Sequence, residues 1–179
     1  EVNPHYRQYG QTITKADPDN TFNFGSRQGE GFGNTVTMSD DGERLFTVSY
    51  GIDGPNNATA SILFVYKWNS STEQWVEEFT YEGDTYSRTG SDIACNYDGT
   101  RFAASSVEAA KIYVFDYSGG SWSLTTTIDG TDPSNGYSAN SSFFGASIDF
   151  SNSGDILAIG SPYHGDGGNL AVYNFTTST

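Results

Sequence analysis

Three stretches of the chain share one pattern of apolar and polar positions. Residues 32–45, 89–102 and 144–157 each have Gly at their second position and another Gly nine positions later. Between the glycines, apolar and polar residues alternate, with the apolar pairs Val36 and Met38, Ile93 and Cys95, and Ile148 and Phe150. Alternation with a period of two is typical of a half-buried strand, and Asp-Gly or Ser-Gly is a turn signal. Each stretch therefore predicts a strand that ends in a hairpin turn.

Two further apolar strands are predicted after each of these turns. The second strands lie at residues 45–48, 102–104 and 157–160, and the third strands at 62–66, 112–115 and 170–173. The third strands are continuously apolar, which is typical of a strand that is covered on both faces. The pattern thus predicts sheets packed between neighbouring sheets.

A fourth strand is predicted in the first two repeats, where Trp75 and Trp122 each stand eight residues before a Gly. The third repeat shows no such strand before residue 179, but an N-terminal segment resembles one. Residues 17–20 match residues 132–135 at an offset of 115, and this offset places Tyr9 on Leu124 and Ile13 on Ile128. Residues 5–14 are therefore predicted to form a fourth strand without the three that precede it.

The predicted fold is all-β and consists of four-stranded antiparallel propeller blades. With the strands of a blade lettered a to d, the chain reads d-abcd-abcd-abc, or about three blades. The predicted ranges are 5–30 for the stray d strand and its loop, 31–83 for blade 1, 84–130 for blade 2, and 131–179 for blade 3 without its d strand. Propellers usually have four to eight blades. The pattern predicts either part of a longer propeller, or copies joined into a ring or filament by strand complementation.

The repeats resemble the FG-GAP repeat of integrin-α-type β-propellers, in its shorter variant. The resemblance rests on Phe-Gly, an apolar strand, Asp-Gly, Leu-Ala-Ile-Gly-Ser-Pro at 157–162, Gly-Asn-Leu-Ala-Val-Tyr at 168–173, and a Trp-led strand. It covers about residues 5–175, with Thr89 in place of the Phe of Phe-Gly in the second repeat. The resemblance implies an extracellular or cell-surface protein.

Many integrin-type repeats bind calcium in an acidic loop between the first two strands. The corresponding turns here are 40–42, 97–99 and 152–154, which are too short and hold too few carboxylates for the 6 to 8 oxygens that calcium takes. We therefore expect no calcium at these turns, and no other cofactor.

Composition narrows the possible partners. The formal net charge of -14 opposes binding to phosphate backbones and to anionic lipid, and no apolar run is long enough to span a membrane. We expect no nucleic acid and no membrane insertion. The single cysteine, Cys95, excludes an internal disulfide and a multi-cysteine zinc site, and its strand position predicts core packing.

Four N-glycosylation sequons begin at Asn57, Asn69, Asn140 and Asn174. Chance alone gives about three in a chain with this Asn, Ser and Thr content, so their positions matter more than their number. Asn57 is predicted in a b–c loop, Asn69 just past a c strand, and Asn140 in a d–a loop, where all three would be exposed. Asn174 is predicted at the end of a c strand.

No catalytic motif is recognisable in the sequence. Asp17, Asp19, Asp53, Asp129, Asp132 and Asp166 stand in Gly- and Pro-rich loops, where Asp is common turn chemistry. Ser161 and His164 lie close together, but Ser161 belongs to the family's second-strand ending. These observations predict that the protein is not an enzyme. Six tyrosines could stack on sugars or bury at a protein contact: Tyr6, Tyr9, Tyr81, Tyr86, Tyr137 and Tyr163.

The sequence thus predicts a structural or adhesion glycoprotein that self-associates, or binds other surface proteins, through Tyr9, Ile13, Leu170 and Val172. Residues 5–14 are expected to pair with the strand at 170–174. The alternative is a carbohydrate-binding propeller module, with loop carboxylates and tyrosines as its ligand-binding groups, which could belong to a larger surface protein or hydrolase.

Overall fold

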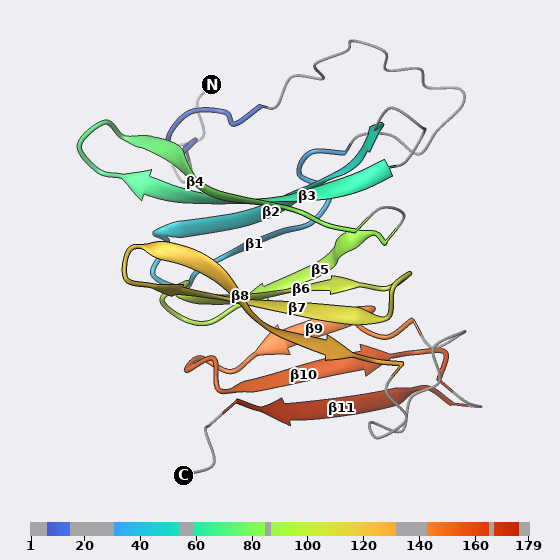
Figure 1. The fold of residues 1–179 in the computed structure, drawn as a ribbon. Coiled ribbons are helices and arrows are strands. Elements are labelled where there is room, and N and C mark those ends of the chain that lie inside the picture. Colours follow the sequence, from blue (N-terminus) through green and yellow to red (C-terminus); the bar gives the residue numbers. More distant parts are fainter. Residues whose placement is uncertain are drawn as a thin grey trace.

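The computed structural model describes residues 7–14, 31–53, 59–84, 87–131, 143–164 and 167–175. Within these ranges the chain forms eleven strands in three antiparallel sheets (Figure 1). No helix in the described ranges is long and apolar enough to cross a lipid bilayer.

Each sheet is a simple meander. Blade 1 is β1 (Val36–Met38), β2 (Arg44–Asp53), β3 (Thr59–Asn69) and β4 (Gln74–Glu82). Blade 2 is β5 (Thr89–Cys95), β6 (Arg101–Ser106), β7 (Lys111–Ser118) and β8 (Ser121–Asp129). Blade 3 is β9 (Ser147–Phe150), β10 (Ile156–Ser161) and β11 (Asn169–Asn174). The predicted fold class is confirmed, and each sheet lies inside one predicted blade range.

The three sheets are stacked face to face, and their contact surfaces form the core (Figure 1). Between blades 1 and 2 the buried side chains are Phe46, Val48, Leu63, Val65, Ile93, Phe102, Ala104, Tyr113, Phe115 and Trp122. Between blades 2 and 3 they are Ala94, Ala103, Ala110, Ile112, Val114, Ile128, Phe144, Ile148, Phe150, Leu157 and Ile159. Because alternate residues of β7 enter the two clusters, the continuous apolar run of this third strand follows from its place in a middle sheet.

The first Gly of the second and third repeats is required where two blades meet. Gly90 and Gly145 have φ of +90° and +83°. A Cβ on Gly90 would lie 2.7 Å from Val48 Cγ2, and one on Gly145 would lie 2.6 Å from Ile112 Cδ1. Only Gly adopts this backbone without strain while allowing such close approach. Thr89, which replaces Phe in the second repeat, is fully buried and its hydroxyl lies 2.8 Å from that of Ser87.

The predicted N-terminal strand is not observed. Residues 7–14 form no strand and no ladder with β11, which is the edge of blade 3. In Figure 1 this segment lies beside β4 at one end of the stack, whereas β11 lies at the other end. A strand requires a neighbouring backbone to pair with, and blades 1 and 2 separate the segment from β11 within one chain.

Candidate functional site

The outer face of blade 3 exposes apolar side chains whose counterparts in the other blades are buried. Cross-strand register identifies the counterparts, because Leu63 faces Val48, Ile112 faces Ser105 and Leu170 faces Gly160 at one level of the repeat. Leu63 and Ile112 are 1% and 0% exposed, whereas Leu170 is 67% exposed. Val65 and Val114 are likewise 0% and 1% exposed, against 64% for Val172.

The opposite end of the stack has a matching open edge on β1. Val36 and Met38 are 60% and 45% exposed, whereas Ile93 and Ile148, which align with Val36, are 5% and 6% exposed. In the later repeats a preceding blade covers this position. We call the outer surface of blade 3, formed by Ile156, Leu170 and Val172, the tail face, and the exposed edge of blade 1, formed by Val36 and Met38, the head face.

The turns after β1, β5 and β9 are joined by a relay of backbone hydrogen bonds. The N–H of Asp40 donates to the C=O of Tyr97 at 2.9 Å, and the N–H of Tyr97 donates to the C=O of Asn152 at 3.0 Å. These three residues stand seven positions after the first Gly of their repeats. Blades 1 and 2 therefore each donate one backbone hydrogen bond to the blade that follows, at the same repeat position.

Arg44 stabilises the packed contact between blades 1 and 2, and we call such a contact between blades a joint. Arg44 donates to Glu78 at 2.9 Å and lies 4.3 Å from the ring centroid of Tyr117 in the next blade. Burial raises the pKa of Glu78, but the hydrogen bonds from Arg44 and Trp122 outweigh burial and hold the pKa below its ordinary value. The pair is therefore charged at neutral pH and links two strands of blade 1 to blade 2.

A second arginine repeats this arrangement between blades 2 and 3. Arg101 pairs with Asp116 on its own sheet, donates to the C=O of Gly154 at 2.9 Å, and lies 5.5 Å from the Phe175 ring. At the same place in blade 3 the chain has Ile156, which is 43% exposed. The sequence analysis did not identify these two arginines. Their signal is their shared position, since Arg44 and Arg101 each stand two residues after the second Gly of their repeat.

Residues 7–14 cover the outer aromatic surface of blade 1. Tyr9 stacks on Trp68 with ring centroids 4.2 Å apart, and the indole N–H of Trp75 donates to the C=O of Tyr9 at 3.3 Å. The Gln11 amide binds both the N–H and the C=O of Trp75, at 2.9 and 2.7 Å. Ile13 packs against the cluster of Phe64, Tyr66, Trp68 and Trp75.

This placement matches the way β4 covers blade 2. Tyr81 of β4 packs on Tyr113 and Phe115, and Glu78 of β4 accepts from the indole of Trp122. The repeat alignment pairs Trp75 with Trp122 and therefore Gly10 with Glu78 and Ile13 with Tyr81. Residues 7–14 thus occupy over blade 1 the position that the fourth strand of a preceding blade occupies over the next.

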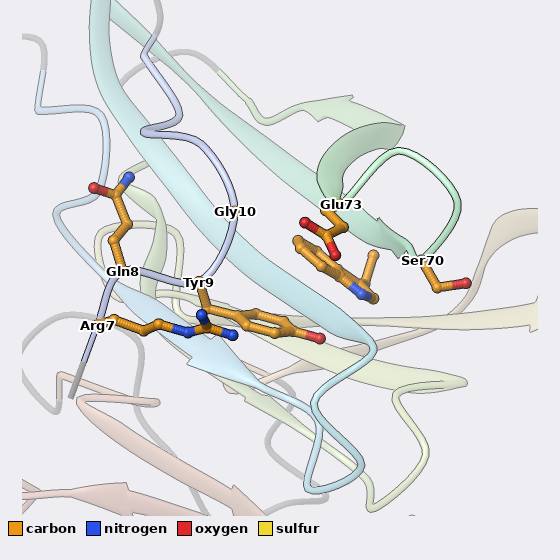
Figure 2. A pocket seen from close by; sticks show the side chains of 7 residues that line it. Arg7, Gln8, Tyr9, Gly10, Ser70 and Glu73 are labelled. Carbon is orange, nitrogen blue, oxygen red and sulfur yellow. The ribbon is translucent and has the colours of Figure 1, made fainter. Parts of the chain in front are cut away.

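A depression of about 470 Å³ opens between this segment and the β3–β4 turn. Figure 2 shows Arg7, Gln8, Tyr9 and Gly10 on one side, and Ser70 and Glu73 on the turn. Trp68 completes the lining. Tyr9 is 60% exposed, so part of its ring remains accessible beside a cation, an amide and a carboxylate.

The sequons fall in different surroundings. Asn57 and Asn140 lie outside the described residues. Asn69 ends β3, and its side-chain oxygen accepts from the N–H groups of Ser71 and Thr72, at 3.0 and 3.2 Å. Asn174 is exposed on β11, on the same face as Leu170 and Val172.

The remaining candidate groups do not come together. Ser161 is buried, while Cys95 is half-buried and burial raises the pKa of its thiol to about 11. Within the part of the chain that the structure describes, no three His, Cys, Asp or Glu residues are placed to hold a metal ion. Tyr81 packs against blade 2 and Tyr163 is exposed. The candidates whose positions lie outside the described residues are Tyr6, Asp17, Asp19, Tyr86, Asp132, Tyr137 and Asp166.

No protein-family model matches the chain, and no curated protein sequence matches it. The fold is similar to the β-propeller domain of Myceliophteria thermophila Cps50 (Swd1), with a TM-score of 0.53 and 15% identity over 79% of this chain and 37% of that chain. It is also similar to Pseudomonas aeruginosa periplasmic gluconolactonase, PpgL, with a TM-score of 0.52 and 19% identity over 78% of this chain and 36% of that chain. A third similar structure is KlAtg21, solved in complex with the coiled coil of AgAtg16, with a TM-score of 0.55 and 18% identity over 78% and 38% of the two chains.

The chain spans well under half the length of each of these proteins. At such identities the likeness shows the fold alone. The three sheets are blades of a β-propeller.

The prediction that the protein is not an enzyme was wrong. It rested on the lack of a recognisable motif, yet the same blade architecture occurs in a protein named as a gluconolactonase. Scaffolds of this kind present functional side chains on loops that are distant in sequence, so a short motif need not mark a site. The likeness assigns no reaction to this chain.

Proposed function

We propose that the protein is an extracellular structural or adhesion module whose FG-GAP-like blades associate head to tail. The observation that carries this proposal is the exposure of Leu170 and Val172 at repeat positions that are otherwise completely buried. Covering an apolar side chain of this size contributes about 1.5–3 kcal/mol. The tail face therefore has the apolar side chains of a buried contact between blades rather than those of an exposed surface.

The partner most compatible with this face is another blade of the same kind. In a repeat stack each unit buries its face only against its neighbour, and an end unit without a polar outer face favours further stacking. β11 also leaves its outer backbone edge without a paired strand among the described residues, which invites strand addition.

Sedimentation velocity over a wide range of protein concentration tests this proposal. We expect the weight-average mass to rise with concentration, and the double variant Leu170→Ser, Val172→Ser to remain a monomer. The matched control replaces Val76 and Leu124, two exposed apolar residues on the fourth strands, with Ser and should associate like the wild type. A wild type that stays monomeric at every concentration would refute self-association.

The extracellular placement is proposed from the FG-GAP resemblance together with the sequons. The Asn69 turn supports this proposal, because its side-chain oxygen is held by two backbone N–H groups in a partly exposed hairpin. Native material should lose mass on treatment with an N-glycosidase, and Asn69→Gln should remove part of that loss. A native mass equal to that of the bare chain would contradict this placement.

A second candidate function, binding of a neutral or weakly charged sugar, is favoured by the depression around Tyr9. An accessible aromatic ring beside Arg7, Gln8 and Glu73 offers the stacking surface and hydrogen-bond groups that a pyranose ring requires. A glycan array followed by titration calorimetry tests it. Binding should be lost in Glu73→Gln and retained in Glu108→Gln, which changes a carboxylate on blade 2. An array without any signal would dismiss this function.

A further inference from the structure

The two joints inside the chain use the same contacts, and each end of the stack carries one half of a third joint. At both joints a glycine of one blade lies against a small side chain of the blade before it. A Cβ on Gly99 would lie 2.9 Å from Ser39 Cβ, and one on Gly154 would lie 3.0 Å from Asn96 Cβ. The corresponding Gly42 has nothing within 4 Å of such a Cβ.

The backbone relay is also incomplete at both ends. Tyr97 both accepts from Asp40 and donates to Asn152. Within the described ranges, the C=O of Asp40 accepts no such bond and the N–H of Asn152 donates none. The head end thus carries the acceptor, and the tail end the donor, that continuation of the relay requires.

The N-terminal segment supplies a third complementary element. β4 pairs with β3 so that Tyr81 faces Leu63 and Phe79 faces Val65. β8 pairs with β7 so that Ile128 faces Ile112 and Thr126 faces Val114. The same register places Ile13 opposite Leu170 and Gln11 opposite Val172 on a blade that precedes blade 1.

We propose that the tail face of one copy docks on the head face of a second copy through a third joint of the same geometry. Asn152 of the first copy donates to Asp40 of the second, and Ser151 of the first lies against Gly42 of the second. Residues 9–13 of the second copy then pair with β11 of the first and complete its four-stranded blade. This inference rests on the proposed self-association and specifies its partner, polarity and register.

The test uses two single-cysteine variants in a Cys95→Ala background, one carrying Ser151→Cys and the other Gly42→Cys. After mixing, a short bismaleimide should cross-link the two variants into a dimer, and neither variant alone should give dimers efficiently. The matched control pairs Ser151→Cys with Gly119→Cys, because Gly119 is another turn glycine with positive φ and nothing within 4 Å. We expect the Gly42 pair to give several times more dimer than the Gly119 pair.

A second measurement does not depend on cysteine chemistry. Ile13→Asp places a charge opposite Leu170 of the neighbouring copy and should weaken association at least tenfold, whereas Gln8→Asp should have no comparable effect. Equal cross-linking of the Gly42 and Gly119 pairs, in a protein that still associates, overturns this joint and leaves self-association standing. A monomeric wild type overturns both.

Discussion

The two ends of the blade stack carry the same repeat, but apolar side chains are covered at one end and exposed at the other. At one end, residues 7–14 and Phe32 cover the aromatic surface of blade 1, so Phe64 and Tyr66 remain buried. At the other end Leu170 and Val172 stay exposed. The repeat pattern is the same in both places. In a stacked fold, a side chain at a given repeat position is therefore buried only where a neighbouring blade or segment covers it.

The largest expected effect comes from a pair of equivalent positions, one inside the stack and one at its end. Ile112→Ala should lower the free energy of unfolding by about 2–5 kcal/mol, because it leaves a cavity in a packed joint. Leu170→Ala should change it by about 0.5 kcal/mol or less in a dilute, monomeric sample. Urea unfolding measures both. Similar losses at the two positions would mean that the tail face is covered in the monomer.

Glycines sharpen the same comparison. Gly90 and Gly33 both have positive φ, +90° and +83°, but only Gly90 approaches a neighbouring blade. Both Gly→Ala variants introduce backbone strain, and Gly90→Ala adds overpacking against Val48, which costs about 1–3 kcal/mol more. Thermal unfolding should therefore show a clearly lower Tm for Gly90→Ala. Equal Tm values would indicate that the joint opens easily.

A single substitution can weaken the contact between residues 7–14 and blade 1. Tyr9→Ala removes the ring that stacks on Trp68 and should shift tryptophan emission to longer wavelength, with a loss of about 1 kcal/mol from the lost aromatic contact. Tyr163→Ala is a suitable control, since Tyr163 is equally exposed and contacts Phe143 instead of a tryptophan. An unchanged emission spectrum in Tyr9→Ala would show that the segment does not cover blade 1 in solution.

The smallest expected effect is a difference in acid sensitivity. The pKa of Glu78 is held below its ordinary value of 4.5 in the folded state, so the stabilisation is present above that value and is lost as the pH falls below it. Glu78→Gln should therefore flatten the decline of stability in this acidic range relative to the wild type. An equal decline in the two proteins would contradict this role of Glu78. Urea midpoints measured at a series of acidic pH values provide the comparison.

The sequence predicted much of the fold because the relevant signals are local. Paired glycines, period-two alternation and Asp-Gly turns led to the three sheets and their order, since each depends on residues adjacent along the chain. The predicted N-terminal strand was wrong because a strand also depends on a neighbouring strand that is distant in sequence. Residues 7–14 have the pattern of a fourth strand, but a strand forms only beside another backbone, and the structure places them against side chains of blade 1.

The sequence pattern marks some residues of the candidate surfaces and leaves others unmarked. Tyr9, Ile13, Leu170 and Val172 follow from the repeat alignment, whereas the arginine braces and the backbone relay do not. In the sequence, an arginine after a turn resembles any exposed arginine. Its contact with Tyr117 or Phe175 of the next blade is visible only in the tertiary structure. The depression around Tyr9 likewise requires Trp68, Ser70 and Glu73, which are distant from Tyr9 in sequence.

By itself the sequence determined the all-β class, the repeat and the order of strands, because alternation and turn chemistry act within a few residues. Only the tertiary structure decided which repeat positions are core and which are surface, because burial is set by whether another blade lies against them. It also decided that the N-terminal segment covers blade 1 rather than pairing with β11 of its own chain. The reason is spatial, since two blades stand between them.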